Sequence, residues 1–85
     1  MKAPLEIPFS VLLVEDDVDI WEMLSMLLLE DNVELCWSRT GHDALQQVDK
    51  QDFDLIMLDL GLPDLNGFEV LRRLRARPRV TNTPV

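Results

Sequence analysis

Cysteine is almost absent from this sequence, with Cys36 as the single example in 85 residues. An internal disulfide is therefore excluded, and such a chain fits a reducing compartment. Long apolar runs are missing too, since none approaches the ~20 residues that a membrane-spanning helix needs. The first residues do not resemble a signal peptide, because Pro4, Glu6 and Pro8 interrupt the apolar core that one requires. These absences predict a soluble, cytoplasmic protein with no membrane partner.

Basic residues are also scarce, with 8 Lys and Arg against 16 Asp and Glu, which gives a formal net charge of −8. That balance argues against a nucleic-acid-binding surface spread over the whole domain. The acids all lie at or before Glu69, whereas residues 72–79 hold five of the eight basic residues. We interpret this basic cluster as a solvated helix end whose cations complement the helix dipole, with a phosphate-binding patch as the alternative.

Two stretches of apolar residues run directly into acids. Residues 55–58 (LIML) lead to Asp59, and residues 9–14 (FSVLLV) lead to Glu15 and Asp16. A continuous apolar run is typical of a strand that is buried on both faces, as in the middle of a parallel sheet. Ligands of open α/β sheets bind at the carboxyl ends of the strands. The three acids are therefore expected at a ligand-binding edge.

The other segments predict the rest of a single α/β domain. Residues 33–38 alternate apolar and polar side chains, as an edge strand does. The wide apolar stripe of residues 18–31 predicts a helix well buried against the sheet, and Asp17, Thr40 and Asn66 are expected to cap helices. The predicted elements are strands at about 9–14, 33–38 and 54–58, helices at about 18–31, 41–50 and 67–76, and the start of a fourth strand at 84–85. Alternating strands and helices predict a parallel sheet in the order two-one-three with helices on both faces.

The third predicted strand presents a difficulty in this arrangement. Its sequence is that of an interior strand, yet in a sheet of three strands it lies at an edge. An exposed apolar edge promotes association or aggregation. The sequence therefore implies a missing neighbour on that side, either in a longer parent chain or in a second copy.

The acids at the predicted sheet edge point to a cation site. If the first and third strands are parallel neighbours, Glu15, Asp16 and Asp59 meet at one end of the sheet. Clustered carboxylates repel one another, so one must be protonated or a cation must lie among them. Oxygen ligands with an open, hydrated sphere favour Mg²⁺, and aspartyl phosphates are established covalent intermediates. Asp16 alone would suit a helix cap, but no helix is predicted directly after Asp59, so a cap does not explain that residue.

Residues 11–17 (VLLVEDD) and 55–67 (LIMLDLGLPDLNG) resemble the receiver domain of bacterial two-component response regulators. The resemblance is strongest to receivers that precede a winged-helix DNA-binding domain, and it covers nearly the whole chain. It implies a flavodoxin-like, CheY-like fold with the strand order 2-1-3-4-5 that is established for this family.

The resemblance also implies roles for individual residues. Asp59 matches the phosphoacceptor, which attacks a phosphohistidine on a partner sensor histidine kinase. Asp16 matches the direct Mg²⁺ ligand, and Glu15 matches the second acid, which acts through metal-bound water. Gly61 matches the position whose backbone carbonyl completes the protein ligands. A receiver of this kind is a signalling module, and we do not expect it to be an enzyme.

The sequence departs from the family pattern at its C-terminal end. A full receiver continues through a fourth and a fifth strand, which end in a Ser or Thr and in a Lys that contact the phosphoryl group. Residues 84–85 match only the opening of the fourth strand, Thr81 and Thr83 come too early, and Lys2 and Lys50 lie in the wrong segments. We therefore expect residues 1–85 to be a truncated receiver with impaired activity, whose contact with nucleic acid would require an absent C-terminal effector domain.

Two other functions remain open at this point. The chain could be a non-catalytic interaction module that forms a homodimer through its unpaired third strand or by exchange of elements. A more distant alternative is a Mg²⁺-dependent phosphohydrolase with an aspartyl nucleophile. Such enzymes generally place a second acid two residues after the nucleophile, where this sequence has Gly61.

Overall fold

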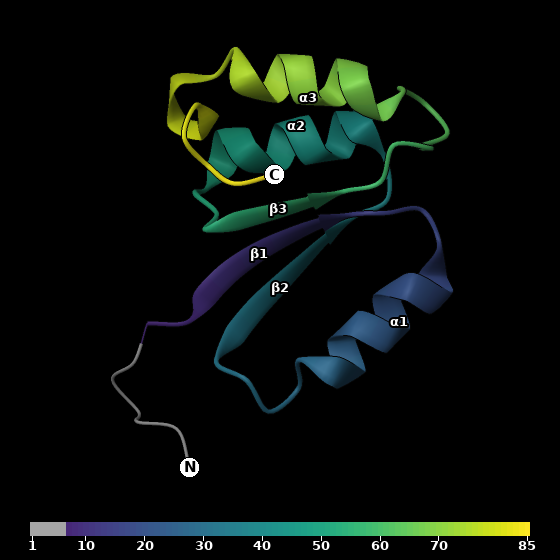
Figure 1. Ribbon diagram of the computed structural model, residues 1–85, viewed down its shortest axis with the longest axis vertical. Coiled ribbons are helices and arrows are strands. Elements are labelled where there is room, and N and C mark those ends of the chain that lie inside the picture. The colour runs from purple at the N-terminus through teal and green to yellow at the C-terminus, as the bar shows by residue number, and fades with distance from the viewer. Residues whose placement is uncertain (1–6) are drawn as a thin grey trace.

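The computed structural model describes residues 7–85 and is a three-layered α/β domain (Figure 1). Its elements in chain order are β1 (Phe9–Val14), α1 (Val18–Leu27), β2 (Val33–Ser38), α2 (Gly41–Lys50), β3 (Leu55–Leu58), α3 (Gly67–Arg75) and the 3₁₀ turn η1 (Pro78–Val80). The strands form a parallel sheet in the order β2-β1-β3. The predicted fold class and strand order are therefore confirmed.

Within residues 7–85, none of the helices has the length and apolar character needed to cross a membrane.

The register of the sheet brings the three strand ends to one level. Val14 at the end of β1 is the partner of Leu58 at the end of β3 and of Ser38 at the end of β2. The central strand β1 is the most buried, with Leu12 and Val14 at 0 % exposure. Whatever follows each strand therefore leaves the sheet at the same edge.

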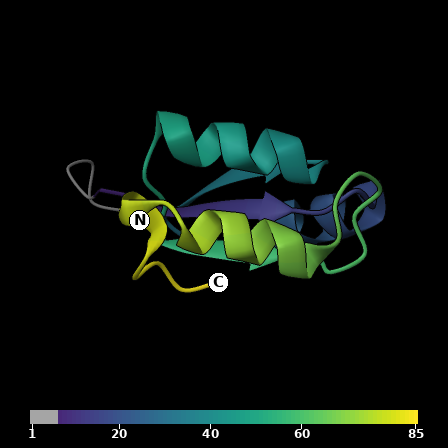
Figure 2. The same cartoon turned by 90° about the horizontal axis from the view of Figure 1, so that it is seen from above.

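The main hydrophobic core lies between the sheet and the pair α2 and α3. Leu12 and Ile56 from the sheet pack with Ala44 and Val48 of α2 and with Val70 of α3. Figure 2 shows α2 and α3 running side by side along the sheet, and Figure 1 shows α1 on the other side of the sheet. The prediction of helices on both faces is thus correct.

Helix α1 ends earlier than its sequence pattern predicts. It ends at Leu27, whereas the apolar stripe predicts an end at about residue 31. Beyond Leu27 the backbone forms tight turns, in which the Leu29 amide donates to the Met26 carbonyl and the Asp31 amide to the Leu28 carbonyl. These bonds span three residues and not four, a common way for an α-helix to finish.

The predicted burial of α1 is also wrong, since none of its residues is fully buried. Ile20 and Leu24 are half-buried and line a groove of about 420 Å³ together with Leu55 and Met57 of β3. Met26, on another side of the helix, is 75 % exposed. An apolar stripe shows that side chains are hydrophobic but not which neighbour covers them, which is why the expectation failed here.

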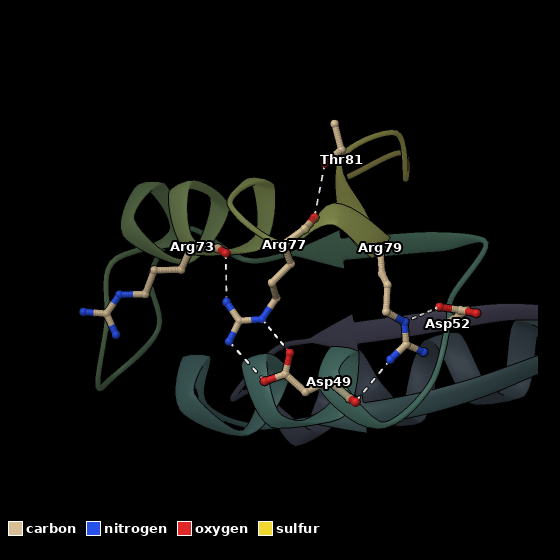
Figure 3. A network of polar contacts seen from close by, with 6 residues as sticks. All are labelled: Asp49, Asp52, Arg73, Arg77, Arg79 and Thr81. Atoms are coloured by element: carbon tan, nitrogen blue, oxygen red, sulfur yellow. Dashed lines mark hydrogen bonds and ion pairs between the residues drawn. The ribbon is translucent and has the colours of Figure 1, made fainter.

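Arg77 and Arg79 hold the segment after α3 to the C-terminal end of α2 (Figure 3). Arg77 makes two hydrogen bonds to the Asp49 carboxylate, at 2.8 and 3.2 Å, and Arg79 donates to Asp52 at 2.8 Å. The interpretation as a solvated helix end suits Arg72, whose side chain is 69 % exposed, but not Arg77, whose side chain is 29 % exposed. The carboxylates occupy both guanidinium groups, so the phosphate-patch alternative loses its support.

The C-terminal residues lie beside β3. The Arg75 guanidinium donates to the carbonyls of Val80 and Thr83, at 2.8 and 2.6 Å, and the Ile56 amide donates to the Pro84 carbonyl at 2.9 Å. One hydrogen bond is less than a regular strand requires, so the predicted start of a fourth strand at residues 84–85 is not formed. The remaining boundaries differ from the predicted ones by single residues, since β3 begins at Leu55 and α3 ends at Arg75.

Candidate metal and phosphoacceptor site

Three carboxylates meet where β1 and β3 leave the sheet. Glu15 and Asp16 follow β1, Asp59 follows β3, and one oxygen of each lies within 4.8 Å of the others. The Asp59 amide donates to the Val14 carbonyl at 3.0 Å, which continues the pairing of the two strands up to the site. The structure therefore brings together the three acidic side chains that the sequence predicted as metal ligands.

The loop that carries the first two acids is held from both sides. The Glu15 amide donates to the Ser38 carbonyl at 2.9 Å, and the Trp37 indole nitrogen donates to the Glu15 carbonyl at 2.7 Å. On the far side of the loop, a side-chain oxygen of Asp17 accepts from the Asp19 amide at 2.8 Å. Asp17 is therefore the N-cap of α1, as predicted, which separates its role from that of Asp16.

The environment of Glu15 makes its carboxyl group harder to ionise in the absence of a cation. Burial is the main cause that raises the pKa of Glu15 from 4.5 to about 7, followed by a hydrogen bond with Asp59 and by the charges of Asp59, Asp16 and Asp17. The Oε2 atom of Glu15 is buried and has no hydrogen-bond partner among the described residues. A buried carboxylate oxygen without a partner is costly.

These observations fit a hard divalent cation. The cluster offers only oxygen donors, and two of its three side chains are half-buried while Asp16 is exposed to solvent. Mg²⁺ uses one or two carboxylates and keeps several waters, so an open, all-oxygen site suits it. A cation here would also give the Glu15 oxygen a partner.

Gly61 contacts the site through its backbone. Its amide donates to the Oδ1 atom of Asp59 at 3.2 Å. The role predicted for the Gly61 carbonyl as a metal ligand remains a prediction. Further along the same loop, the Gly67 amide donates to the Leu60 carbonyl at 3.0 Å, and a Cβ atom on Gly67 would lie 2.4 Å from the Leu60 Cα. Glycine is therefore required there for the loop to close onto α3.

Asp64 ties the loop after β3 to the start of α2, a contact that the sequence did not predict. Its carboxylate accepts from the Gly41 amide at 2.9 Å, from the His42 amide at 3.0 Å and approaches the His42 Nδ1 atom at 2.6 Å. Burial by itself would raise the pKa of Asp64, but the hydrogen bonds from His42 and Gly41 hold it well below its ordinary value. Thr40 caps the same helix, as predicted, by accepting from the Asp43 amide.

Two tryptophans lie beside the acidic loop. Trp21 and Trp37 stack, with ring centroids 4.9 Å apart and an angle of 8° between the planes. Trp37 in addition donates to Glu15, so it contacts the site that the acids form. The sequence signal for this contact is weak, since it consists only of a Trp near the end of an edge strand.

Fold and site together define a class of protein. A parallel sheet in the order 2-1-3, with clustered acids at the carboxyl ends of its neighbouring strands, is the arrangement of a doubly wound α/β domain that binds its ligand at the strand ends. The family profile described as "Response regulator receiver domain" matches residues 11–85. The chain belongs to this family. No observation favours the phosphohydrolase alternative. Such enzymes generally have a second acid two residues after the nucleophile, and this chain has Gly61 at that position.

Relatives by sequence are response regulators. The transcriptional regulatory protein CpxR homolog of Haemophilus influenzae is 37 % identical over 76 residues, which are 89 % of this chain and 32 % of the relative. The cell cycle response regulator CtrA of Brucella ovis is 38 % identical over 65 residues, which are 76 % of this chain and 28 % of the relative. The chain thus spans about a third of the length of these two proteins.

Solved structures agree with this assignment. The chemotaxis response regulator CheY4 of Vibrio cholerae has a TM-score of 0.87 and 31 % identity, over 92 % of this chain and 65 % of that one. The receiver domain of the sensor histidine kinase PA1611 of Pseudomonas aeruginosa has a TM-score of 0.86 and 26 % identity, over 92 % of this chain and 64 % of that one. That structure contains a magnesium ion coordinated in the active site cleft.

Proposed function

We propose that this chain is a phosphoacceptor domain, in which Asp59 accepts a phosphoryl group from the phosphohistidine of a sensor histidine kinase. The proposed metal ligands for Mg²⁺ are Glu15, Asp16, Asp59 and the Gly61 carbonyl. The observation that carries the proposal is the convergence of three carboxylates within 4.8 Å at the end of two parallel strands. The magnesium ion in the Pseudomonas aeruginosa receiver supports the choice of metal.

The chemistry requires an oxygen nucleophile held in place. An Asp59 carboxylate oxygen attacks phosphorus, the bond from phosphorus to the imidazole nitrogen breaks, and the imidazole leaves with the electron pair. The Gly61 amide restrains Asp59 through Oδ1, and the continued pairing with β1 restrains its backbone. When bound, Mg²⁺ supplies the positive charge that stabilises the transferring phosphoryl group. The chain is modified in this reaction and is not an enzyme.

The C-terminal hydroxyl groups do not assist this transfer. The Thr81 hydroxyl donates to the Arg77 carbonyl at 3.2 Å, and the Thr83 hydroxyl donates to the Arg79 carbonyl at 3.5 Å. Both are committed to the backbone around η1, and Lys50 ends α2. The contacts that a Ser or Thr and a Lys make to the phosphoryl group in the family are therefore not supplied by these residues.

The signalling context follows from the same proposal. A receiver meets the phosphohistidine of its kinase in the cytoplasm, so we place the protein there. The name of the Haemophilus influenzae relative, a transcriptional regulatory protein, supports an output in transcription control. With a net charge of −8, the chain itself is a poor ligand for nucleic acid, and contact with DNA would fall to a domain outside residues 1–85.

Phosphorylation can be tested by treating the protein with acetyl phosphate in Mg²⁺ and recording intact mass. The proposal predicts the gain of one phosphoryl group, located at Asp59 by peptide mapping and absent after Asp59→Asn. The protein should gain no phosphoryl group when excess chelator is present from the start of the treatment. A phosphoryl group that persists in Asp59→Asn would contradict the assignment of the acceptor. No gain in mass for the chain even with a phosphorylated sensor kinase would contradict the function.

The second candidate is self-association through β3, and one observation favours it. An apolar groove of about 420 Å³ beside β3 is lined by Leu24, Leu55, Met57 and Val85. The apolar sequence of β3 is typical of an interior strand, which has a neighbour on each side. A second copy of the chain is the occupant we propose for it. Sedimentation velocity should then show a dimer that Met57→Lys dissociates and that Met23→Lys, on α1 outside the groove, does not. A monomer at high concentration would exclude this candidate.

A further inference from the structure

Three consecutive residues at the end of β2 hold the backbone of the acidic loop. The Trp37 indole donates to the Glu15 carbonyl at 2.7 Å, and the Ser38 carbonyl accepts from the Glu15 amide at 2.9 Å. Arg39 reaches the Asp16 carbonyl with Nη2 at 3.5 Å, a longer and weaker contact. Both acids after β1 are therefore tied to β2, while the sheet ties Asp59 to β1.

The orientation of the Trp37 indole is fixed by its neighbours. Trp21 of α1 stacks on it with an angle of 8° between the ring planes, and the Arg39 guanidinium carbon lies 5.1 Å from the ring centroid. Stacked rings and a cation over a ring each restrain an aromatic side chain. The restrained indole directs its N–H at Glu15, so that the donor is in place before a cation arrives.

We propose that Trp37 is a positioning residue for the cation site, and that its indole N–H senses whether the site is occupied. The proposal rests on the proposed function, since it takes the acidic cluster to be a Mg²⁺ site. Preorganisation lowers the cost of bringing carboxylates to a cation. Free-energy coupling is reciprocal, so a contact that strengthens cation binding must itself be strengthened by the cation.

The alternative is that Trp37 serves packing alone, and the pair of tryptophans provides a matched control. Trp37→Phe keeps an aromatic ring against Trp21 but removes the donor to Glu15. Trp21→Phe is the same substitution on the other ring of the same stack, and it leaves the donor in place. Packing alone predicts that the two variants affect Mg²⁺ binding equally.

Isothermal titration of Mg²⁺ into wild type and the two variants separates these cases. Removal of one hydrogen bond should weaken Mg²⁺ binding about three- to tenfold in Trp37→Phe, and Trp21→Phe should stay within about twofold of wild type. Thermal unfolding without Mg²⁺ should show a loss in both variants, since both lose indole atoms from the stack, and a larger loss in Trp37→Phe, which also loses the hydrogen bond to Glu15. Equal affinities for the two variants would overturn the proposal.

A measurement on the wild-type protein covers the case in which Trp37→Phe does not fold. A ¹H–¹⁵N spectrum contains one indole cross-peak for each of the two tryptophans, and Trp21→Phe assigns them by removing one. The Trp37 peak should shift on titration with Mg²⁺, with the same midpoint as the calorimetric binding, and more than the Trp21 peak. A Trp37 peak that stays fixed while Mg²⁺ binds would overturn the proposal alone. Absence of any Mg²⁺ binding would overturn the metal site and the positioning role together.

Discussion

Val14 of β1 and Leu58 of β3 are register partners in a parallel ladder, and the Asp59 amide extends the pairing by donating to the Val14 carbonyl at 3.0 Å. Glu15 and Asp59, the residues directly after these partners, must therefore leave the sheet at the same level. A slip of one residue in this register would turn the buried Ile56 side chain of β3 to the opposite face. The hydrophobic core thus fixes the position of the acids.

Stability should fall as the pH rises through the titration of Glu15. Burial raises the pKa of Glu15 from its ordinary value of 4.5 to about 7 in the folded protein. Between pH 4.5 and pH 7, the folded state therefore binds more protons than the unfolded state. Free energy of unfolding then decreases from pH 4.5 towards pH 7 and levels off above it. The lowered pKa values of Glu69 and Asp64 act in the opposite sense, but below about pH 4.5.

Urea unfolding at pH 5, 6, 7 and 8 in chelator measures this dependence. Glu15→Gln should reduce the fall in the free energy of unfolding between pH 5 and pH 7. Glu34→Gln, on the exposed edge of β2, should leave this fall unchanged. Mg²⁺ at pH 8 should restore stability in the wild type. A stability that rises steadily from pH 5 to pH 8 in chelator would show that Glu15 does not titrate in this way.

Asp64 should contribute to stability through the start of α2. Its carboxylate accepts from two backbone amides there, so Asp64→Ala should lower the free energy of unfolding by about 0.5–2 kcal/mol, as for other lost helix caps. His42→Ala removes only the side-chain contact at 2.6 Å, and a pair this exposed contributes about 0–1 kcal/mol. Urea unfolding at pH 7 compares the two variants. A larger loss of stability in His42→Ala than in Asp64→Ala would contradict the role of the Asp64 carboxylate as acceptor for the first amides of α2.

The two loop glycines should respond differently to the same substitution. In Gly67→Ala the new Cβ would lie 2.4 Å from the Leu60 Cα, a backbone atom, so the loop must move at a cost of about 1–3 kcal/mol. In Gly61→Ala the nearest atoms lie 3.8 Å away, and the smaller entropy of the unfolded chain makes a neutral or stabilising change the expected result. Thermal unfolding decides between them. Equal effects would mean that the loop does not pack closely on α3.

The sequence predicted correctly those features that depend on residues close together in the chain. The continuous apolar runs of β1 and β3 and the alternation in β2 were enough to order the sheet, and the parallel order then placed Glu15, Asp16 and Asp59 together. Caps were equally predictable, because a short polar side chain before a helix satisfies amides that have no other partner. Asp17, Thr40 and Asn66 each accept the expected bond.

The failures share a different physical origin, since each depends on contacts between distant segments. The apolar residues of α1 predicted a buried helix, but their burial depends on what packs over them. The ion pair between Arg77 and Asp49 spans 28 residues, and the bonds from Asp64 to the start of α2 span 22 and 23. Hydrogen bonds from an indole or a guanidinium are set by tertiary geometry, and composition does not predict them.

Calorimetric titration of Mg²⁺ into the wild type, Asp16→Asn and Asp17→Asn tests the central claim that Glu15, Asp16 and Asp59 hold one cation. The two substitutions are identical and adjacent, but Asp16 belongs to the carboxylate cluster, whereas Asp17 caps α1, a role that Asn fills as well. We predict one Mg²⁺ per chain for the wild type and Asp17→Asn, with binding at least tenfold weaker in Asp16→Asn. Wild-type protein that binds no Mg²⁺, or binding that Asp16→Asn leaves unchanged, would contradict the account.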